Sequence, residues 1–331
     1  MTHLRFTSTH TDYLHDIVYN WGGTLLATAS SDHTISVWRR STSGVEWTPL
    51  CVLRAHNGPI HSLSFAHPSF GNLLASGSSD RAVSIFAGDE SFRLIVRLVD
   101  SNDSVTSVAF SPPHLGLKLA AACLSGHVRV YESRDVINLS DWSLTDSLSI
   151  ECDKLTCANV SWCGNLFIQP LLAVSADSSL SVYAYSTKPN ARNVWQAIAS
   201  CVGHSNYIHS IEFAPSVGRS YELVASGCAD QRVRLFKLSQ GVIETQKKNQ
   251  SSKTEIGWQA SCIASFALES IVLKVSFNVS GSMLASTADD GLTRIYTCTD
   301  DQQWKQIKTL AENESEEVVG NETDWIGDEF G

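Results

Sequence analysis

A pattern of apolar and polar positions recurs six times along the chain. Each copy holds a short apolar run, a polar turn, and an alternating segment that closes on an aromatic residue. The copies read LLATASSDHTISVW, LLASGSSDRAVSIF, KLAAACLSGHVRVY, LLAVSADSSLSVY, LVASGCADQRVRLF and MLASTADDGLTRIY. Two strands joined by a tight turn have this pattern, because alternation places every second side chain on one face of a sheet. We therefore predict one β-hairpin in each copy.

Further strands are predicted on both sides of each hairpin. One precedes it, as at residues 60–65 and 105–110, and another follows it, as at 92–99 and 304–310. Four short antiparallel strands per repeat are the unit of a β-propeller blade. We therefore predict an all-β, six-bladed propeller over residues 1–310. Residues 239–257, which are polar and lysine-rich, are predicted to form an exposed loop within blade five.

Composition places the charge of the chain outside the repeats. The 331 residues are 43% hydrophobic and 18% charged, as in a compact globular protein, and the net charge is −10. Residues 311–331 contain eight acids and no Lys or Arg, so we predict an acidic, disordered tail there. Without a basic cluster, direct nucleic-acid binding is not expected. The longest apolar runs are too short for a transmembrane segment.

Histidines recur in pairs on three of the predicted blades. Because the pairs lie on separate blades, we do not expect them to converge on one catalytic or metal site. The first His of each pair lies 22 to 26 residues before the Asp of its turn. The pairs are His10 and His15, His56 and His61, and His204 and His209.

This arrangement resembles the Asp-His-Ser/Thr-Trp hydrogen-bond network of WD-repeat blades. The resemblance implies a structural role for His10, Thr28, Asp32 and Trp38 in blade one, His56, Ser76 and Asp80 in blade two, and His204, Ser226 and Asp230 in blade five. Blade three has Ser125 at the Asp position and no matching His, so its network is predicted to be absent. Blades four and six are predicted to keep only the Asp.

Motifs for catalysis and cofactor binding are absent from the sequence. It has no G-x-S-x-G, no phosphate-binding P-loop, no G-x-G-x-x-G after a strand and no C-x-x-C pair. We therefore predict a non-enzymatic protein with no cofactor, no metal ion and no catalytic residues.

Closure of the predicted ring is left open by the strand pattern. Blades one and six each have an outer strand of their own, at 47–53 and 304–310, and neither end of the chain offers a spare strand. Six blades could close unaided, or the ring could stay open. An open ring exposes apolar blade faces, and such faces need a partner.

Three segments carry a closer resemblance. They are HTDYLHDIVYNWGGTLLATASSD at 10–32, SPPHLGLKLAAACLSGHVRVYESRDVINLSDWSL at 111–144, and FAPSVGRSYELVASGCADQRVRLF at 213–236. They are similar to the Seh-one nucleoporins of the Sec-thirteen-like WD-repeat family, over about residues 10–310. This resemblance implies an open six-bladed propeller, completed by a blade that an α-solenoid nucleoporin inserts in trans between blades one and six.

The resemblance also implies a function. Members of this family are structural scaffold subunits of the Y-shaped outer-ring complex of the nuclear pore, at the nuclear envelope. There they act with other Y-complex nucleoporins in nucleocytoplasmic transport, including mRNA export and protein transport. The family also joins a GATOR- or SEA-type nutrient-signalling complex, upstream of TORC1, at lysosomal or vacuolar membranes.

Chain topology suggests where an inserted blade would bind. We expect the interface in the first strand of blade one (Leu14, Ile17 and Tyr19) and in the first strand of blade six (Leu273, Val275 and Phe277). Two other functions remain open from the sequence. One is a COPII vesicle-coat subunit of the Sec-thirteen kind, and the other is a WD-repeat adaptor that recognises substrates for an enzyme complex.

Overall fold

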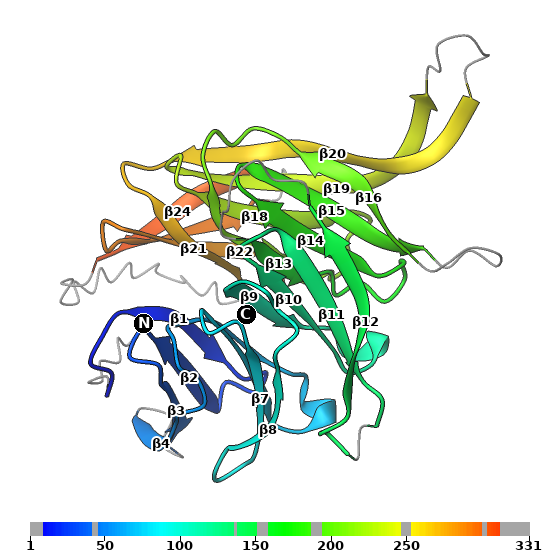
Figure 1. Ribbon diagram of the computed structural model, residues 1–331. Helices are drawn as coiled ribbons and strands as arrows, with labels where there is room; N and C mark the ends of the chain where they lie inside the picture. Colours follow the sequence, from blue (N-terminus) through cyan, green and yellow to red (C-terminus); the bar gives the residue numbers. More distant parts are fainter. Residues whose placement is uncertain are drawn as a thin grey trace, which may run out of the picture.

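The six predicted repeats fold into six β-sheet blades (Figure 1). The computed structural model describes residues 9–41, 46–135, 138–150, 158–186, 194–245, 253–299 and 303–311. Each blade is a four-stranded antiparallel sheet built from four consecutive strands. The predicted all-β, six-bladed propeller is therefore confirmed.

The first three blades hold twelve strands and two 3-10 helices. Blade one consists of β1 (Leu14–Tyr19), β2 (Leu25–Ser30), β3 (Ile35–Arg40) and β4 (Trp47–Leu53). Blade two consists of β5 (Ile60–Phe65), β6 (Leu73–Ser78), β7 (Val83–Ala87) and β8 (Arg93–Leu98). Blade three consists of β9 (Val105–Phe110), β10 (Lys118–Cys123), β11 (His127–Ser133) and β12 (Trp142–Ser149). The helices η1 (Pro68–Phe70) and η2 (Pro113–Leu115) lie between the first and second strands of blades two and three.

The last three blades repeat this order. Blade four consists of β13 (Asn159–Trp162), β14 (Leu171–Ala176), β15 (Ser179–Ser186) and β16 (Val194–Cys201). Blade five consists of β17 (Ile208–Phe213), β18 (Glu222–Cys228), β19 (Arg232–Thr245) and β20 (Lys253–Ala267). Blade six consists of β21 (Val272–Phe277), β22 (Met283–Ala288), β23 (Thr293–Cys298) and β24 (Trp304–Leu310). Among the described residues, no helix is long and apolar enough to cross a membrane.

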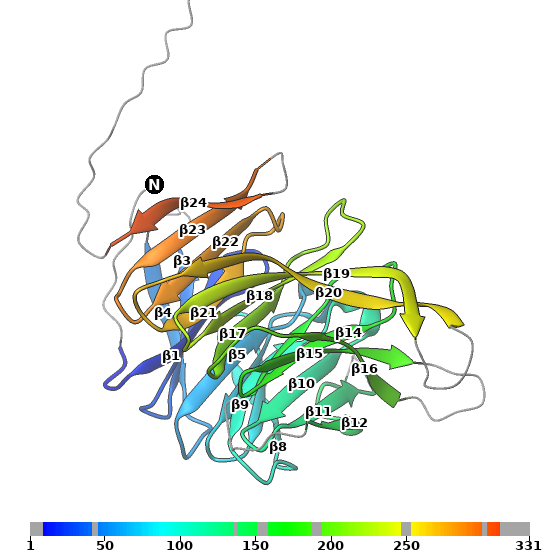
Figure 2. The ribbon, with the colours of Figure 1, turned by 90° about the horizontal axis from the view of Figure 1, so that it is seen from above.

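Packing between neighbouring blades forms the core. The second strand of a blade lies inside its sheet, and in blades two, four and five every residue of it is buried between the neighbouring blades. Every residue of β2 is buried as well. Across the described residues there are five hydrophobic clusters, and each joins one blade to the next along the chain. The first strands surround the centre of the ring, where Figure 1 shows β1, β9, β13 and β21, and Figure 2 gives the view from above.

The turn aspartates shape the hairpins. The carboxylates of Asp32, Asp80, Asp230 and Asp290 each accept the backbone N–H of the residue two places on. Such an Asx turn lets the next residue adopt a left-handed conformation. In blade four, whose turn is one residue shorter, Asp177 itself adopts φ 54°.

Residues 239–257 do not form the predicted loop. Most of them continue β19 and β20 as a paired ribbon, in which Val242 lies opposite Ile256 and Thr245 opposite Lys253 (yellow in Figure 1). The β-branched residues of this segment favour strands, and they outweigh the polar residues that suggested a loop. Residues 246–252 lie outside the described residues, as does the predicted acidic tail after Ala311.

Candidate functional site

The predicted network of blade one comes together around His10. Its Nδ1 lies 2.9 Å from Asp32 Oδ2, and its Nε2 lies 2.8 Å from Thr28 Oγ1. The indole Nε1 of Trp38 donates to Thr28 Oγ1 at 3.4 Å. Four residues from the N-terminal segment, β2, the turn and β3 therefore form one chain of hydrogen bonds. This chain ties the entry into blade one to its central hairpin.

Blade two repeats the arrangement with a different closing residue. His56 Nδ1 lies 3.0 Å from Asp80 Oδ1, and His56 Nε2 lies 2.7 Å from Ser76 Oγ. A carboxylate can only accept, so the Nδ1–H donates to Asp80 and the Nε2 accepts from the Ser76 hydroxyl. Phe86 stands at the Trp position, so no indole closes this network. Arg97 donates to the other oxygen of Asp80 at 2.7 Å.

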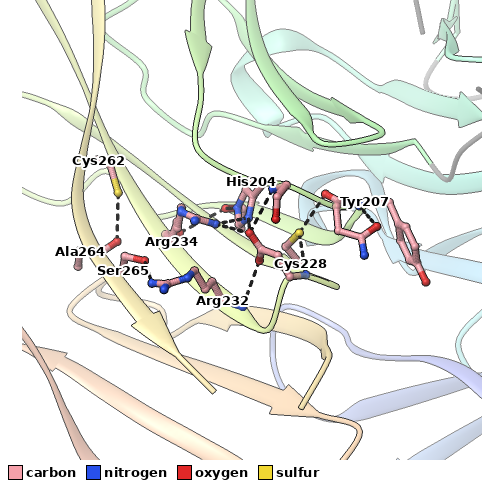
Figure 3. A network of polar contacts seen from close by, with 12 residues as sticks. His204, Tyr207, Cys228, Arg232, Arg234, Cys262, Ala264 and Ser265 are labelled. Atoms are coloured by element: carbon pink, nitrogen blue, oxygen red, sulfur yellow. Dashed lines mark hydrogen bonds and ion pairs between the residues drawn. The ribbon is translucent and has the colours of Figure 1, made fainter. Parts of the chain in front are cut away.

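Blade five has the same network, and here too an arginine contacts the Asp (Figure 3). His204 Nδ1 lies 3.0 Å from Asp230 Oδ2, and His204 Nε2 lies 2.7 Å from Ser226 Oγ. Arg234 donates to the same Asp230 oxygen at 2.7 Å. The His204 ring is fully enclosed.

Electrostatics fix the charge state of these networks. Burial lowers the pKa of His56 and of His204, although the aspartate beside each favours the charged ring. Burial alone would raise the pKa of Asp230, but hydrogen bonds from Arg234, Cys228 and His204 outweigh it and lower that pKa to about 2. At neutral pH each of these two sites therefore holds a neutral imidazole and a carboxylate. Both ring nitrogens of His56 and of His204 are hydrogen-bonded within their own blade, an arrangement suited to a structural clamp.

One group in the described part of the chain has the composition of a metal site. Ligand atoms of His204, Cys228 and Asp230 lie within 4.8 Å of one another. Both ring nitrogens of His204 are already hydrogen-bonded. The positive charge beside the Asp230 carboxylate is supplied by the Arg234 guanidinium, where a metal ion would otherwise bind. Burial raises the pKa of Cys228 to about 12, so its sulfur stays a thiol rather than a metal-binding thiolate. The group is part of the blade-five clamp.

Blade three replaces the network with other polar residues. Ser101 takes the position of the His, and its hydroxyl accepts from Cys123 Sγ and from Arg129 Nη1 at 3.4 and 3.5 Å. Arg129 also donates to Cys123 Sγ at 3.2 Å. The Ser125 turn therefore belongs to a blade that is held by a buried arginine.

The second His of each pair has a different location from the first. His15, His61 and His209 all line one cavity of about 810 Å³, which the first strands of the six blades surround. The rings of His15 and His61 lie 5.0 Å apart. The second histidines thus share a cavity, because the first strands meet at the ring centre. Among the described residues they do not form a group that could hold a metal ion, so nothing contradicts the expectation that the pairs share no catalytic or metal site. The Nε2 atoms of His15 and His61 bind Ser31 and Ser79, both at 2.6 Å.

The joint between blade six and blade one differs from the other five. These two blades are neighbours around the ring (blue and orange in Figure 1), yet among the described residues no hydrophobic cluster joins them. The side of blade six that faces blade one is incompletely covered, since β22 alternates between buried and half-buried residues. We call this joint the seam.

On the blade-one wall of the seam, the apolar side chains of β1 are exposed, while the residues of β2 are buried. Leu14, Ile17 and Tyr19 are 44%, 48% and 59% exposed. The equivalent residues of blade two are Ile60, Leu63 and Phe65, which pack against blade one. Three positions that are core elsewhere in the ring are thus exposed here, and no hydrophobic cluster of the described residues joins them to blade six. The Tyr19 ring contacts Trp47 of its own blade, with ring centroids 5.6 Å apart.

The blade-six wall differs from the sequence prediction. Leu273 is 46% exposed, but Val275 is only 2% exposed and packs against blade five, as Phe277 partly does. A β-bulge between Val272 and Lys274 shifts the alternation, so that Val275 shares the face of Val272. Val275 and Phe277 are therefore on the wrong side of blade six to meet a partner at the seam.

The residues of blade six that do face the seam were missed from the sequence. They are Lys274, Ala285 and Thr287. A sequence feature could have identified Thr287 as a seam residue, because its equivalents in the other five blades have smaller side chains or none. They are Ala29, Gly77, Ala122, Ser175 and Gly227. At Gly77 and Gly227 an added Cβ would lie within 2.7 Å of a valine of the next blade. Thr287 fits because no blade approaches it.

Comparison with known proteins identifies the family. The repeat family described as WD domain, G-beta repeat, matches residues 1–39, 47–86 and 195–237. Nucleoporin SEH1 of Osmerus mordax is 35% identical over 317 residues, covering 89% of this chain and 83% of the relative. Nucleoporin SEH1 of Xenopus tropicalis is 34% identical over 320 residues, covering 91% and 86%. Nucleoporin SEH1 of Homo sapiens is 34% identical over 325 residues, covering 92% and 87%. The chain belongs to the SEH1 nucleoporin family.

Membership of the SEH1 family confirms the resemblance seen in the sequence. It implies that the chain is a component of the nuclear pore complex. SEH1 proteins are WD-repeat scaffolds, a class that is generally non-catalytic. The clamps in blades one, two and five have the structural character expected of such a scaffold.

Proposed function

We propose that the chain is a structural scaffold subunit of the Y-shaped outer-ring complex of the nuclear pore, at the nuclear envelope. In this role an α-solenoid nucleoporin inserts a β-blade into the seam, and other Y-complex nucleoporins complete the assembly. The scaffold would serve nucleocytoplasmic transport, including mRNA export and protein transport. The observation that carries the proposal is the seam, where core positions of blade one stay exposed.

Physical chemistry supports a blade as the occupant. The walls of the seam are two sheet faces, and the other five joints show that a sheet packed on such a face buries its apolar side chains. Burial of apolar surface contributes about 25 cal/mol per Å². A blade packed between both walls would bury apolar surface on each of its two faces, and so gain this free energy at both. It would also continue the circular order of the propeller.

The same seam supports a second membership. A GATOR- or SEA-type nutrient-signalling complex at the lysosomal or vacuolar membrane would be joined through any solenoid subunit that presents an equivalent blade. The seam recognises a blade and not a particular complex, so the two roles are compatible. The similarity to SEH1 proteins favours these two roles over the alternatives, which are a subunit of a COPII coat and an adaptor that recognises substrates.

Affinity purification with two variants tests the proposal. Tyr19→Asp places a charge on the blade-one wall, and Phe167→Asp places one in blade four, across the ring from the seam, at a residue that is 94% exposed. Mass spectrometry of proteins recovered at native abundance should find an α-solenoid nucleoporin with the wild type and with Phe167→Asp, but not with Tyr19→Asp. Both variants should melt as the wild type does. Retention of the solenoid by Tyr19→Asp, or recovery of coat subunits alone, would overturn the proposal.

A further inference from the structure

A polar residue stands at the same position in the first strand of every blade. In five blades its side chain bonds the backbone of the next blade's first strand, so these residues form a ring of contacts around the central cavity. The five contacts are Asp16 with Leu63 N at 2.8 Å, Ser62 with Val108 N at 3.1 Å, Ser107 with Val160 N at 3.3 Å, Asn159 with Ile208 O at 2.9 Å, and Ser210 with Val275 N at 3.3 Å.

The sixth member of this ring is Lys274, which faces the seam. Its Nζ donates to the backbone oxygen of Ile17 at 3.2 Å and also contacts the Asp16 carboxylate. Four of the other five positions carry a shorter side chain with an oxygen acceptor, and the fifth carries an amide. A lysine reaches further on its four-carbon stem and can only donate. Its length suits the one joint where the neighbouring blade is not packed closely.

The two ends of this contact are not equally free to move. Asp16 Oδ2 is held by the Leu63 N–H, and the Asp16 side chain is only 10% exposed. The Lys274 side chain is 44% exposed. The carboxyl of Glu212, on the blade-five side, is held by the Phe277 N–H at 2.9 Å. The Lys274 ammonium is therefore the movable part of the group.

We propose that Lys274 is the specificity-determining residue of the seam. In the isolated chain it closes the seam onto Asp16 and the Ile17 carbonyl. When a blade is inserted, it transfers to a hydrogen-bond acceptor on the first strand of that blade. A carboxylate is the strongest such acceptor, and a Lys or Arg at the same level would be repelled. This inference rests on the proposed function, and it adds the chemistry that the inserted strand must carry.

The closing contact is testable without a partner. Lys274→Met keeps the apolar stem and removes the ammonium, while Lys305→Met makes the same change on the exposed β24. In the isolated full-length chain, amide hydrogen exchange in Leu14–Tyr19 should become about threefold faster in Lys274→Met, in line with loss of a partly exposed ion pair. Lys305→Met should leave it unchanged. Unchanged exchange in Lys274→Met would overturn the closing role.

Transfer to the inserted strand is tested with the solenoid recovered in the purification above. Asp16→Asn breaks the ion pair but keeps the acceptor for Leu63, and it leaves Lys274 free to bond the inserted strand. We expect Asp16→Asn to bind the solenoid about threefold more tightly than the wild type, and Lys274→Met to bind at least threefold more weakly than Asp16→Asn. Equal binding by these two variants would overturn transfer to the partner. If even the wild type forms no complex, the proposed function itself fails, and the specificity role fails with it.

Discussion

A turn aspartate with a histidine partner performs two tasks that can be separated by mutation. Asp80 accepts the N–H groups of Asn57 and Ala82, pairs with Arg97, and also holds the buried His56. Asp290 likewise accepts the N–H of Leu292 in its own turn and pairs with Arg294. These bonds to Asp290 do not include one from a histidine. The His–Asp bond is thus an addition to a turn that forms without it.

Asp80→Ala should therefore lower the free energy of unfolding more than Asp290→Ala. Removing Asp80 leaves the Nδ1–H of His56 buried without an acceptor, which costs about 1–3 kcal/mol. Asp290 is 23% exposed, so its loss should cost less. Urea unfolding of the two variants measures the difference, and equal losses would contradict the role of the histidine network.

Glu212 gives the joint between blades five and six a dependence on pH. Burial raises the pKa of its carboxyl from an ordinary 4.5 to about 7. The folded chain therefore binds this proton more tightly than the unfolded chain, and the resulting stability is full below about pH 4.5 and lost as the pH rises through 7.

Glu212→Gln should remove that dependence. Its amide oxygen can still accept the Phe277 N–H, so at about pH 8 the variant should be more stable than the wild type by on the order of 1 kcal/mol. Near pH 4.5 the two proteins should unfold alike. Urea unfolding across this range is the measurement, and parallel curves for the two proteins would contradict the assignment.

At the scale of strands, close approach of β18 to β21 requires Gly227. A Cβ there would lie 2.6 Å from Val272 Cγ1. Gly227→Thr should therefore destabilise the chain by about 1–3 kcal/mol, the usual cost of overpacking. Blade six carries a threonine, Thr287, at the same position, where no blade approaches. Thr287→Val is the control, and it should change the unfolding midpoint much less. Equal shifts in the two variants would contradict an open seam.

The strand pattern could be predicted wherever side-chain alternation marks one face. The six hairpins, with their Asp turns and closing aromatics, follow from this rule. Val275 shows where the rule fails, because a β-bulge changes the face of a residue without changing its sequence spacing. The long ribbon of β19 and β20 was missed because polar residues masked its β-branched ones.

The candidate site could be predicted only in part. Its blade-one wall, including Ile17 and Tyr19, was found because topology alone makes the first and last blades neighbours. Lys274 and Thr287 were missed because each is unusual only in comparison with its equivalents in other blades. Those equivalences depend on strand register, which the structure supplies.

For the whole molecule, the open seam gives equivalent residues unequal roles. Ile17 and Leu63 occupy the same position in the first strands of blades one and two. Leu63 is 3% exposed and packs in the joint between these blades, while Ile17 is 48% exposed. The same residue position is therefore part of the core in one blade and exposed, on the proposed docking surface, in the other.

Truncation of these two residues should separate stability from assembly. Leu63→Ala should cost about 2–5 kcal/mol, because it removes buried methyl groups and leaves a cavity. Ile17→Ala should cost less than about 0.5 kcal/mol in the isolated chain, as an exposed substitution does. In the proposed complex we expect the order to reverse, because the inserted blade would bury Ile17, whereas Leu63 packs between blades one and two. Denaturant unfolding of the isolated chain and affinity for the solenoid measure the two effects. An Ile17→Ala variant that binds the solenoid as tightly as the wild type would remove blade one from the interface.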